Sequence, residues 1–183
     1  MHVPTGDATG AKGPEMSEPQ AGAGPRTTTF NILFVCTGNT CRSPLAEGIA
    51  RGELERRGWR NVRVASAGLA ARPGEEATGH AVTVAGRDGI DLSAHRSQPL
   101  TPGLAEWADL ILAMGPSHLA ALHRIGAAEK AATLGDFVAG GEGEGYPVAD
   151  PYGGPEEVYE ETYRELRALI SAAFDRLAPI LAP

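Results

Sequence analysis

Short apolar runs that alternate with helical patterns restrict the fold of this chain more than any other feature. Each run is suited to a strand that is buried on both faces, and helical patterns lie between the runs. This alternation predicts an α/β fold with a parallel sheet, in which ligands bind at the carboxyl ends of the strands. The predicted strands cover residues 31–35, 62–65, 109–114 and, more weakly, 131–134.

Residue pairs that commonly start helices, and glycines that end them, mark the predicted helices. Ser43-Pro44 supplies a capping residue and a proline for the first turn, and Gly58 is placed to end that helix. The last helix opens at Gly154-Pro155 and keeps one face apolar, with Tyr159 expected at an exposed position. Further helices are predicted over residues 76–88 and from Thr101-Pro102 and Gly115-Pro116.

The composition of the chain changes sharply near residue 28. Residues 1–28 hold five glycines and four prolines and almost no large apolar side chains, so they cannot bury enough surface to offset the entropy of ordering. We therefore expect a disordered N-terminal extension over residues 1–28. The rest, residues 29–183, is expected to form one domain around a core of ordinary size.

Charge and cysteine content limit the partners of this chain. A formal net charge of -7 argues against binding to nucleic acid or to an anionic membrane surface. Two cysteines spaced Cys-x4-Cys form neither a disulfide scaffold nor a paired zinc knuckle, and no apolar run is long enough to span a membrane. We expect a monomer in the reducing cytoplasm. The histidines lack ligand spacing and no Gly-Lys-Ser/Thr loop is present, so neither a metal nor a nucleotide cofactor is predicted.

The loop after the first strand carries the strongest chemical signal. Five residues separate Cys36 from Arg42, and Ser43 is expected to cap the next helix, so the backbone N–H groups of the loop should surround a phosphate at the helix's positive end. That helix end and Arg42 favour the thiolate of Cys36, to which Ser43 can donate, and Arg42 can grip two phosphoryl oxygens. Gly38 permits close approach of the backbone, while Asn39 can adopt a left-handed conformation and fix the loop through its amide.

A nucleophile of this kind needs an acid to protonate the leaving group and a base to activate water against the phosphocysteine. Asp150 is the candidate for both tasks. It precedes a proline, which holds the backbone extended or in a turn, so its carboxylate can project from a loop over the site.

Three segments together resemble the low-molecular-weight protein tyrosine phosphatases. These segments are Ile32–Glu47, Ser66-Ala67-Gly68 and Asp150-Pro151-Tyr152, and the likeness spans about residues 30–180. The resemblance implies a flavodoxin-like three-layer sandwich, with a four-stranded parallel sheet flanked by helices. It also implies a metal-independent enzyme that hydrolyses phosphorylated protein residues through a phosphocysteine, with Cys36 as nucleophile, Arg42 as transition-state clamp and Asp150 as acid and base.

The same resemblance implies roles for the residues around the loop. A hydrogen-bond network that fixes the loop would consist of Asn39, Ser43, Ser66 and His95. Cys41 would form a reversible disulfide with the nucleophile and spare it further oxidation. Contacts with substrate are expected from Thr37, Gly38, Asn39, Thr40, Cys41, Ser43 and Tyr152.

The loop sequence is more similar to the bacterial protein-arginine phosphatase branch than to the tyrosine-specific one. Thr40 is the chief indication, because in the arginine branch this threonine replaces a bulkier aliphatic residue and suits the flat, polar guanidinium group. The arginine branch usually has phenylalanine where this chain has Tyr152, which is nearer to the tyrosine phosphatases. We favour protein phosphoarginine as substrate, with phosphotyrosine as the alternative.

Two further classes of protein fit the same loop. A thiol-dependent arsenate reductase needs a downstream cysteine to relay reducing equivalents, and this chain has only Cys36 and Cys41. A non-catalytic module that binds phosphorylated residues would need neither a nucleophile nor an acid. The joint presence of Cys36, Arg42 and Asp150 therefore favours an enzyme.

Overall fold

A parallel sheet of four strands forms the centre of the fold, which a computed structural model describes over residues 28–181. The strands lie in the order β2-β1-β3-β4, and every neighbouring pair is parallel. The expected four-stranded parallel sheet is thereby confirmed. The strand bounds are Phe30–Cys36 (β1), Val62–Gly68 (β2), Leu110–Ala113 (β3) and Ala131–Thr133 (β4).

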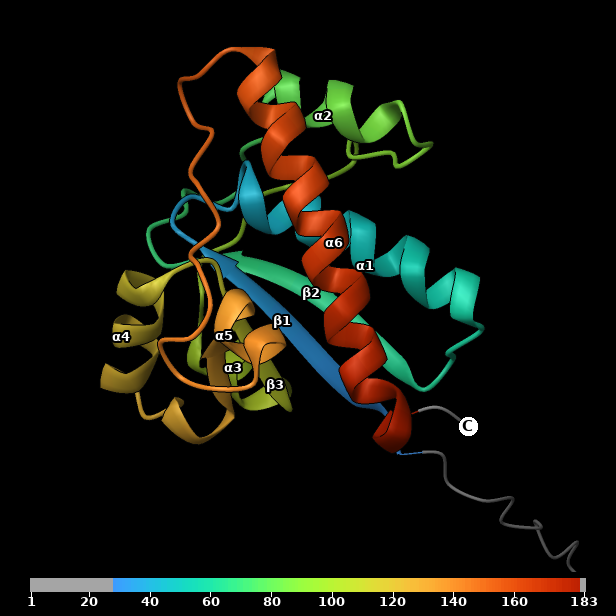
Figure 1. The fold of residues 1–183 in the computed structure, drawn as a ribbon. Coiled ribbons are helices and arrows are strands. Elements are labelled where there is room, and N and C mark those ends of the chain that lie inside the picture. The colour runs from blue at the N-terminus through green and yellow to red at the C-terminus, as the bar shows by residue number, and fades with distance from the viewer. Residues whose placement is uncertain (1–27, 182–183) are drawn as a thin grey trace, which may run out of the picture.

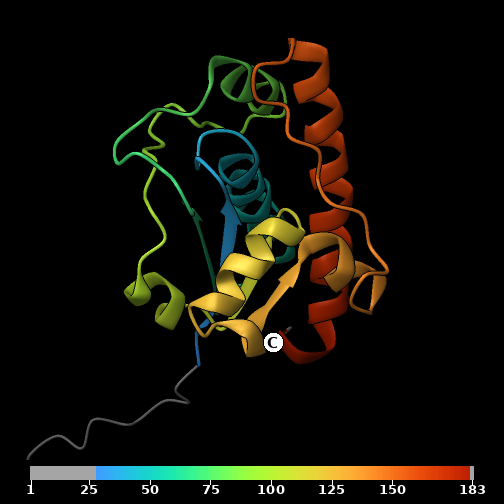
Figure 2. The same cartoon turned by 90° about the vertical axis from the view of Figure 1, so that its left-hand side faces the viewer.

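Helices cover both faces of this sheet and give the expected three-layer sandwich (Figures 1 and 2). Helices α1, α2, α5 and α6 share one core with Ile32 and Phe34, whereas α3 and α4 pack over Leu33 and Val35 on the opposite face. This division follows from the alternation of side chains along β1. The helix bounds are Arg42–Arg57 (α1), Gly79–Gly86 (α2), Pro102–Trp107 (α3), Pro116–Arg124 (α4), Leu134–Ala139 (α5) and Glu156–Leu181 (α6), with a short 3-10 turn at Ala128–Lys130.

Several predicted helix ends agree with the structure, and others differ from it. Gly58 ends α1 in the left-handed conformation, as expected. The helix predicted over residues 76–88 is shorter, because Thr78 is still extended and the chain turns after Gly86. Helix α5 was not predicted. Thr133 ends the weak strand and caps this helix, because its hydroxyl accepts a hydrogen bond from the backbone N–H of Asp136.

Two expectations concern the ends of the chain and the membrane. The predicted N-terminal extension, residues 1–28, lies outside the described residues except for its last position. Within residues 28–181, none of the helices combines the length and apolar character needed to cross a bilayer.

Candidate active site

The loop between β1 and α1 lies where the order of the strands reverses. β1 is central, and its neighbours β2 and β3 are reached by connections that run in opposite directions across the sheet. Figure 1 shows the chain leaving the end of β1 and curving back into α1. In open parallel sheets this position is where ligands bind. Residues 37–41 thus connect a buried strand directly to the positive end of a helix.

The sulfur of Cys36 sits inside this loop with two polar neighbours. Ser43 Oγ lies 2.9 Å from the sulfur, and the backbone N–H of Asn39 points at it from 3.3 Å. The residue itself is only 3% exposed. A thiolate at this position is therefore stabilised by donors from the loop and by the N-terminus of α1.

Asn39 holds the loop in shape from within. Its φ of 55° lies in the left-handed region, as the sequence predicted. Its amide nitrogen donates to Ser43 Oγ at 2.8 Å and to Ser66 Oγ at 2.9 Å, while its amide oxygen accepts from the backbone N–H of Gln98 at 2.9 Å. Its backbone carbonyl lies 2.7 Å from Nε2 of His95. The four residues expected to form the network are thus brought together.

Ser43 does not cap α1, and that prediction was wrong. The helix begins at Arg42, two residues earlier than a Ser43 cap would place it, and the side chain of Cys41 at the capping position makes no capping hydrogen bond. Ser43 lies in the first turn, where its hydroxyl faces Cys36 and Asn39 instead of the free N–H groups of the helix. The curvature of the loop brings these two partners within hydrogen-bond distance of the hydroxyl.

Arg42 and Asp150 meet beside the loop although they are far apart in sequence. Nη2 of Arg42 lies 2.9 Å from Oδ2 of Asp150, and Nη1 donates to the carbonyl of Val148 at 3.3 Å. The arginine side chain is buried, whereas the aspartate side chain is 52% exposed. Oδ1 of Asp150 accepts from the backbone N–H of Tyr152 at 3.2 Å, so the carboxylate is fixed by its own turn.

A cleft of about 360 Å³ opens over the loop. It includes the predicted nucleophile, the arginine and the aspartate, with Tyr152 strongly exposed at its edge. Asn39 and Ser43 are fully buried and do not line the cleft, so their side chains belong with the supporting network, not with the predicted substrate contacts. The lining residues are Cys36, Thr37, Gly38, Thr40, Cys41, Arg42, Ala70, Arg72, Glu75, Asp150 and Tyr152.

Tyr159 and His118 are site residues that sequence analysis missed. Tyr159 was expected to be exposed, but it is 2% exposed and its hydroxyl lies 3.4 Å from the sulfur of Cys41. Burial, together with that contact, raises the pKa of Tyr159 to about 12, so it stays neutral. His118 on α4 places Nε2 2.9 Å from the hydroxyl of Thr37. Burial, and then the charge of Arg42, lower the pKa of His118, which favours the neutral ring.

Glu47 extends the network beyond the predicted residues. Its carboxylate accepts a hydrogen bond from Ser66 Oγ at 2.6 Å. It stands four positions after Ser43 on the same helix, a spacing that puts both side chains on one face, so the sequence did contain a signal for it. Among the residues described, no group of three or more acidic, histidine or cysteine side chains is arranged to hold a metal ion.

This geometry defines a class of protein. A buried thiol inside a loop of backbone N–H groups, with an arginine and a carboxylate paired at the same cleft, is suited to covalent transfer of a phosphoryl group to sulfur. The protein is a cysteine-dependent phosphatase.

Comparison with known proteins identifies the family. The model of the family described as low molecular weight phosphotyrosine protein phosphatase matches residues 31–179. The chain belongs to this family, as the sequence motifs had indicated.

Individual relatives agree with this assignment. The protein-arginine-phosphatase of Bacillus subtilis is 44% identical over 143 residues, which cover 77% of this chain and 92% of that protein. The low molecular weight protein-tyrosine-phosphatase Etp of Escherichia coli is 35% identical over 137 residues, or 73% of this chain and 86% of that protein. A solved structure of the YwlE arginine phosphatase, a cysteine-to-serine mutant with a phosphorylated active-site serine, matches with a TM-score of 0.77 and 41% identity over 82% of this chain and 97% of that one.

Replacing Asn39 by alanine should both destabilise the folded protein and lower its catalytic rate. The change removes three side-chain hydrogen bonds and places a Cβ-bearing residue without a compensating amide at a positive φ. We expect the free energy of unfolding to fall by about 2–4 kcal/mol, measured by urea denaturation. Asn39→Gly is the matched variant, because it tolerates the positive φ but still lacks the hydrogen bonds. It should recover about 1 kcal/mol of stability but little activity; full activity in both variants would contradict the proposed support of the loop.

Proposed function

We propose that this enzyme hydrolyses phosphoarginine in proteins. The observation that carries the proposal is the position of Thr40, whose polar side chain lines the cleft together with the carboxylate of Asp150. A guanidinium group is flat, cationic and rich in donors, so it fits a wall that offers a hydroxyl and carboxylates better than a phenyl ring does. Glu75 adds a second carboxylate to the lining of the same cleft. The name of the Bacillus subtilis relative gives the same substrate class.

In the first step, the thiolate of Cys36 attacks phosphorus and forms a sulfur–phosphorus bond. The phosphorus–nitrogen bond breaks, and the departing guanidine nitrogen takes a proton from Asp150. Arg42 and the backbone N–H groups of the loop hold the phosphoryl oxygens as the transition state develops. Asp150 must be protonated for this transfer, so its ion pair with Arg42 belongs to the resting enzyme and is released when Arg42 turns to the phosphoryl oxygens.

In the second step, water attacks the phosphocysteine. Asp150, now a carboxylate, accepts the proton of the water as the oxygen–phosphorus bond forms. The sulfur–phosphorus bond breaks, and Ser43 and the N–H of Asn39 stabilise the thiolate that returns. Inorganic phosphate then leaves the cleft.

Cys41 is proposed as a protective partner of the nucleophile. Both cysteines are free thiols and both line the cleft. Peroxide would oxidise Cys36 to a sulfenic acid, and attack by Cys41 would release water and form a disulfide that an external thiol reduces. Because catalysis needs free Cys36, we place the enzyme in the reducing cytoplasm. It is proposed to act there as a monomer on phosphorylated proteins.

Phosphotyrosine is the second candidate substrate. The aromatic ring of Tyr152 stands strongly exposed at the edge of the cleft, where it can pack against another aromatic ring. The name of the Escherichia coli relative gives this activity.

Thr40→Ile tests the choice between the two substrates. The change replaces a hydroxyl on the cleft wall with a larger apolar group, which disfavours a guanidinium and favours a ring. We expect wild-type enzyme to prefer phosphoarginine peptides in kcat/KM. The variant should shift that preference toward phosphotyrosine by about 10–100-fold.

Thr37→Val is the matched control for this comparison, since it also removes a hydroxyl from the loop but one that faces His118. It should slow the hydrolysis of both substrates similarly and leave the ratio of their kcat/KM values unchanged. A strong preference of the wild type for phosphotyrosine would refute the phosphoarginine proposal.

A further inference from the structure

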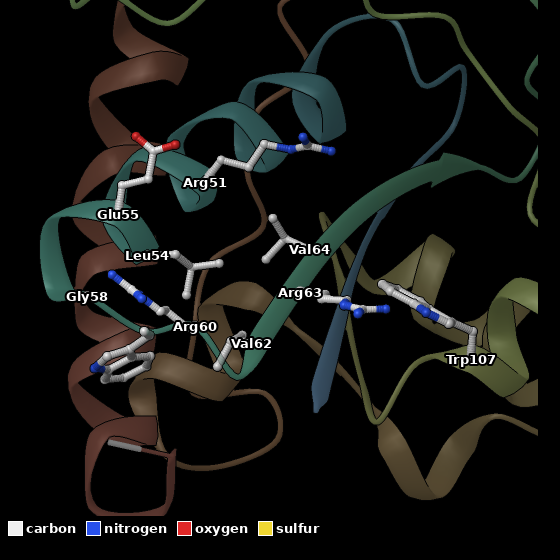
Figure 3. A pocket seen from close by; sticks show the side chains of 10 residues that line it. Arg51, Leu54, Glu55, Gly58, Arg60, Val62, Arg63, Val64 and Trp107 are labelled. Carbon is white, nitrogen blue, oxygen red and sulfur yellow. The ribbon is translucent and has the colours of Figure 1, made fainter. Parts of the chain in front are cut away.

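A groove of about 700 Å³ lies at the edge of the sheet, away from the cleft. Figure 3 shows it between the carboxyl-terminal half of α1 and the first half of β2. Leu54, Val62 and Val64 give it apolar walls. Both tryptophans of the chain, Trp59 and Trp107, also line it.

β2 is an outer strand of the sheet, and part of its free edge is unpaired. Gly68 directs both backbone groups outward: its N–H donates to Gln98 at 3.0 Å and its carbonyl accepts from Leu100 at 2.8 Å. Backbone groups alternate in direction along a parallel strand, so those of Val62 and Val64 also face outward. Within residues 28–181, no strand pairs with them.

The rim of the groove is basic although the chain as a whole is acidic. Arg51, Arg60 and Arg63 line it, and Glu55 is the only acidic residue among its lining. Arg51 forms an ion pair with Glu47, outside the groove. Arg60 and Arg63 are exposed and form no ion pair with any residue that the structure describes. In Figure 3, the side chain of Arg63, which belongs to β2, and the side chain of Trp107 point toward one another.

We propose that this groove binds an acidic, extended segment of the protein substrate as an additional strand beside β2. A row of outward N–H and carbonyl groups is matched by a peptide backbone, which nucleic acid and small anions lack. The arginines select acidic side chains on that segment. The inference deepens the proposed function, on which it rests, by naming a recognition element of the substrate.

The register of the sheet sets the distance between groove and cleft. Gly68 pairs with Cys36, and Val62 and Val64 stand six and four residues before it on β2. At about 3.3 Å per residue, the bound segment would lie about 13–20 Å from the nucleophile. A linker of about five to ten residues between the acidic segment and the phosphorylated residue can span this distance.

Binding is tested by titrating wild-type protein with a ten-residue peptide that alternates glutamate and threonine, followed by tryptophan fluorescence. The double variant Arg60→Glu, Arg63→Glu should weaken binding at least about tenfold. Arg124→Glu with Arg164→Glu is the matched control, because both residues are exposed and the net charge changes equally. That control should keep the wild-type affinity, and hydrolysis of a small aryl phosphate should be unchanged in all three proteins.

Two altered peptides test whether the segment binds as a strand. N-methylation of alternate residues removes the donors of one edge without changing charge, and lysine in place of glutamate reverses the charge. Both should lose at least about tenfold in affinity. Equal binding of either peptide, tighter binding of single-stranded DNA, no measurable binding, or a dimer that buries this edge in sedimentation would overturn the proposal. Since the titration needs no turnover, its failure is distinguishable from failure of the phosphoarginine proposal.

Discussion

Cys36→Ser is expected to abolish turnover while leaving substrate binding intact. The serine hydroxyl occupies nearly the same space, so the loop, Arg42 and the contact with Ser43 can persist. A hydroxyl, however, is not ionised at neutral pH and is a far weaker nucleophile than a thiolate. Loss of a nucleophile that acts together with its partners lowers kcat by at least about 10⁴-fold.

Two measurements on the same preparation check this result. Steady-state kinetics with phosphoarginine peptides gives the loss of kcat, and titration with the same peptides gives Kd, which should change by less than about tenfold. Cys41→Ser is the matched control, since it makes the same replacement in the same loop. Its turnover should stay within about tenfold of wild type, because Cys41 is not assigned to the chemical steps.

A Cys36→Ser variant that keeps turnover within tenfold of wild type would remove Cys36 from the mechanism. The thermal unfolding midpoint of both variants separates a chemical effect from a folding defect. If only Cys36→Ser loses turnover and both unfold like wild type, the loss belongs to the sulfur and not to the loop.

Two kinds of information predicted the site: the contiguous residues of the loop, and the family resemblance, which supplied the distant residues Ser66, His95 and Asp150. Residues 37–41 lie between an apolar strand and a helix, so their local order already implies a loop at the carboxyl end of a strand. The left-handed conformation of Asn39 could be predicted because asparagine tolerates a positive φ. The burial of Ser43 inside the loop could not be predicted, because it depends on the curvature of the chain, which the capping propensity of serine does not reveal.

The parts that could not be predicted depend on contacts between distant elements. Tyr159 reaches Cys41 across 118 positions of sequence, and His118 reaches Thr37 across 81. Both stand on helices whose periodicity does not say which neighbour covers them. The basic groove beside β2 could not be predicted for the same reason, because its arginines come from α1, the following turn and β2.

Among the helices, errors arose where short patterns compete. The segment 131–139 contains a three-residue strand followed at once by a six-residue helix, and neither is long enough to show its own period. By contrast, α6 extends over 26 residues, and its apolar face was visible in the sequence. The equally short α3 was predicted because Thr101-Pro102 marks its start, a signal that is lacking before α5.

Asp150→Asn is expected to slow hydrolysis of phosphoarginine far more than hydrolysis of an activated aryl phosphate. The amide keeps the shape of the side chain but can neither donate a carboxylic proton to the leaving group nor accept one from water. A departing guanidine nitrogen needs protonation, whereas a nitrophenolate leaves readily without it. General acid catalysis is worth about 10²–10⁴-fold, so kcat on phosphoarginine peptides should fall by that factor.

The comparison of the two substrates in one variant distinguishes the role of Asp150 in the first step from its other contacts. Losing its ion pair with Arg42 would affect both substrates alike, because Arg42 holds the phosphoryl group that they share. Glu75→Gln supplies the matched control, since it neutralises another carboxylate of the same cleft and should preserve kcat on the aryl phosphate. Equal slowing of both substrates by Asp150→Asn would assign Asp150 to positioning Arg42 or to the shared second step, and unchanged rates would exclude it from the chemistry. A selective loss on phosphoarginine is expected, because only that leaving group depends on the proton that Asp150 carries.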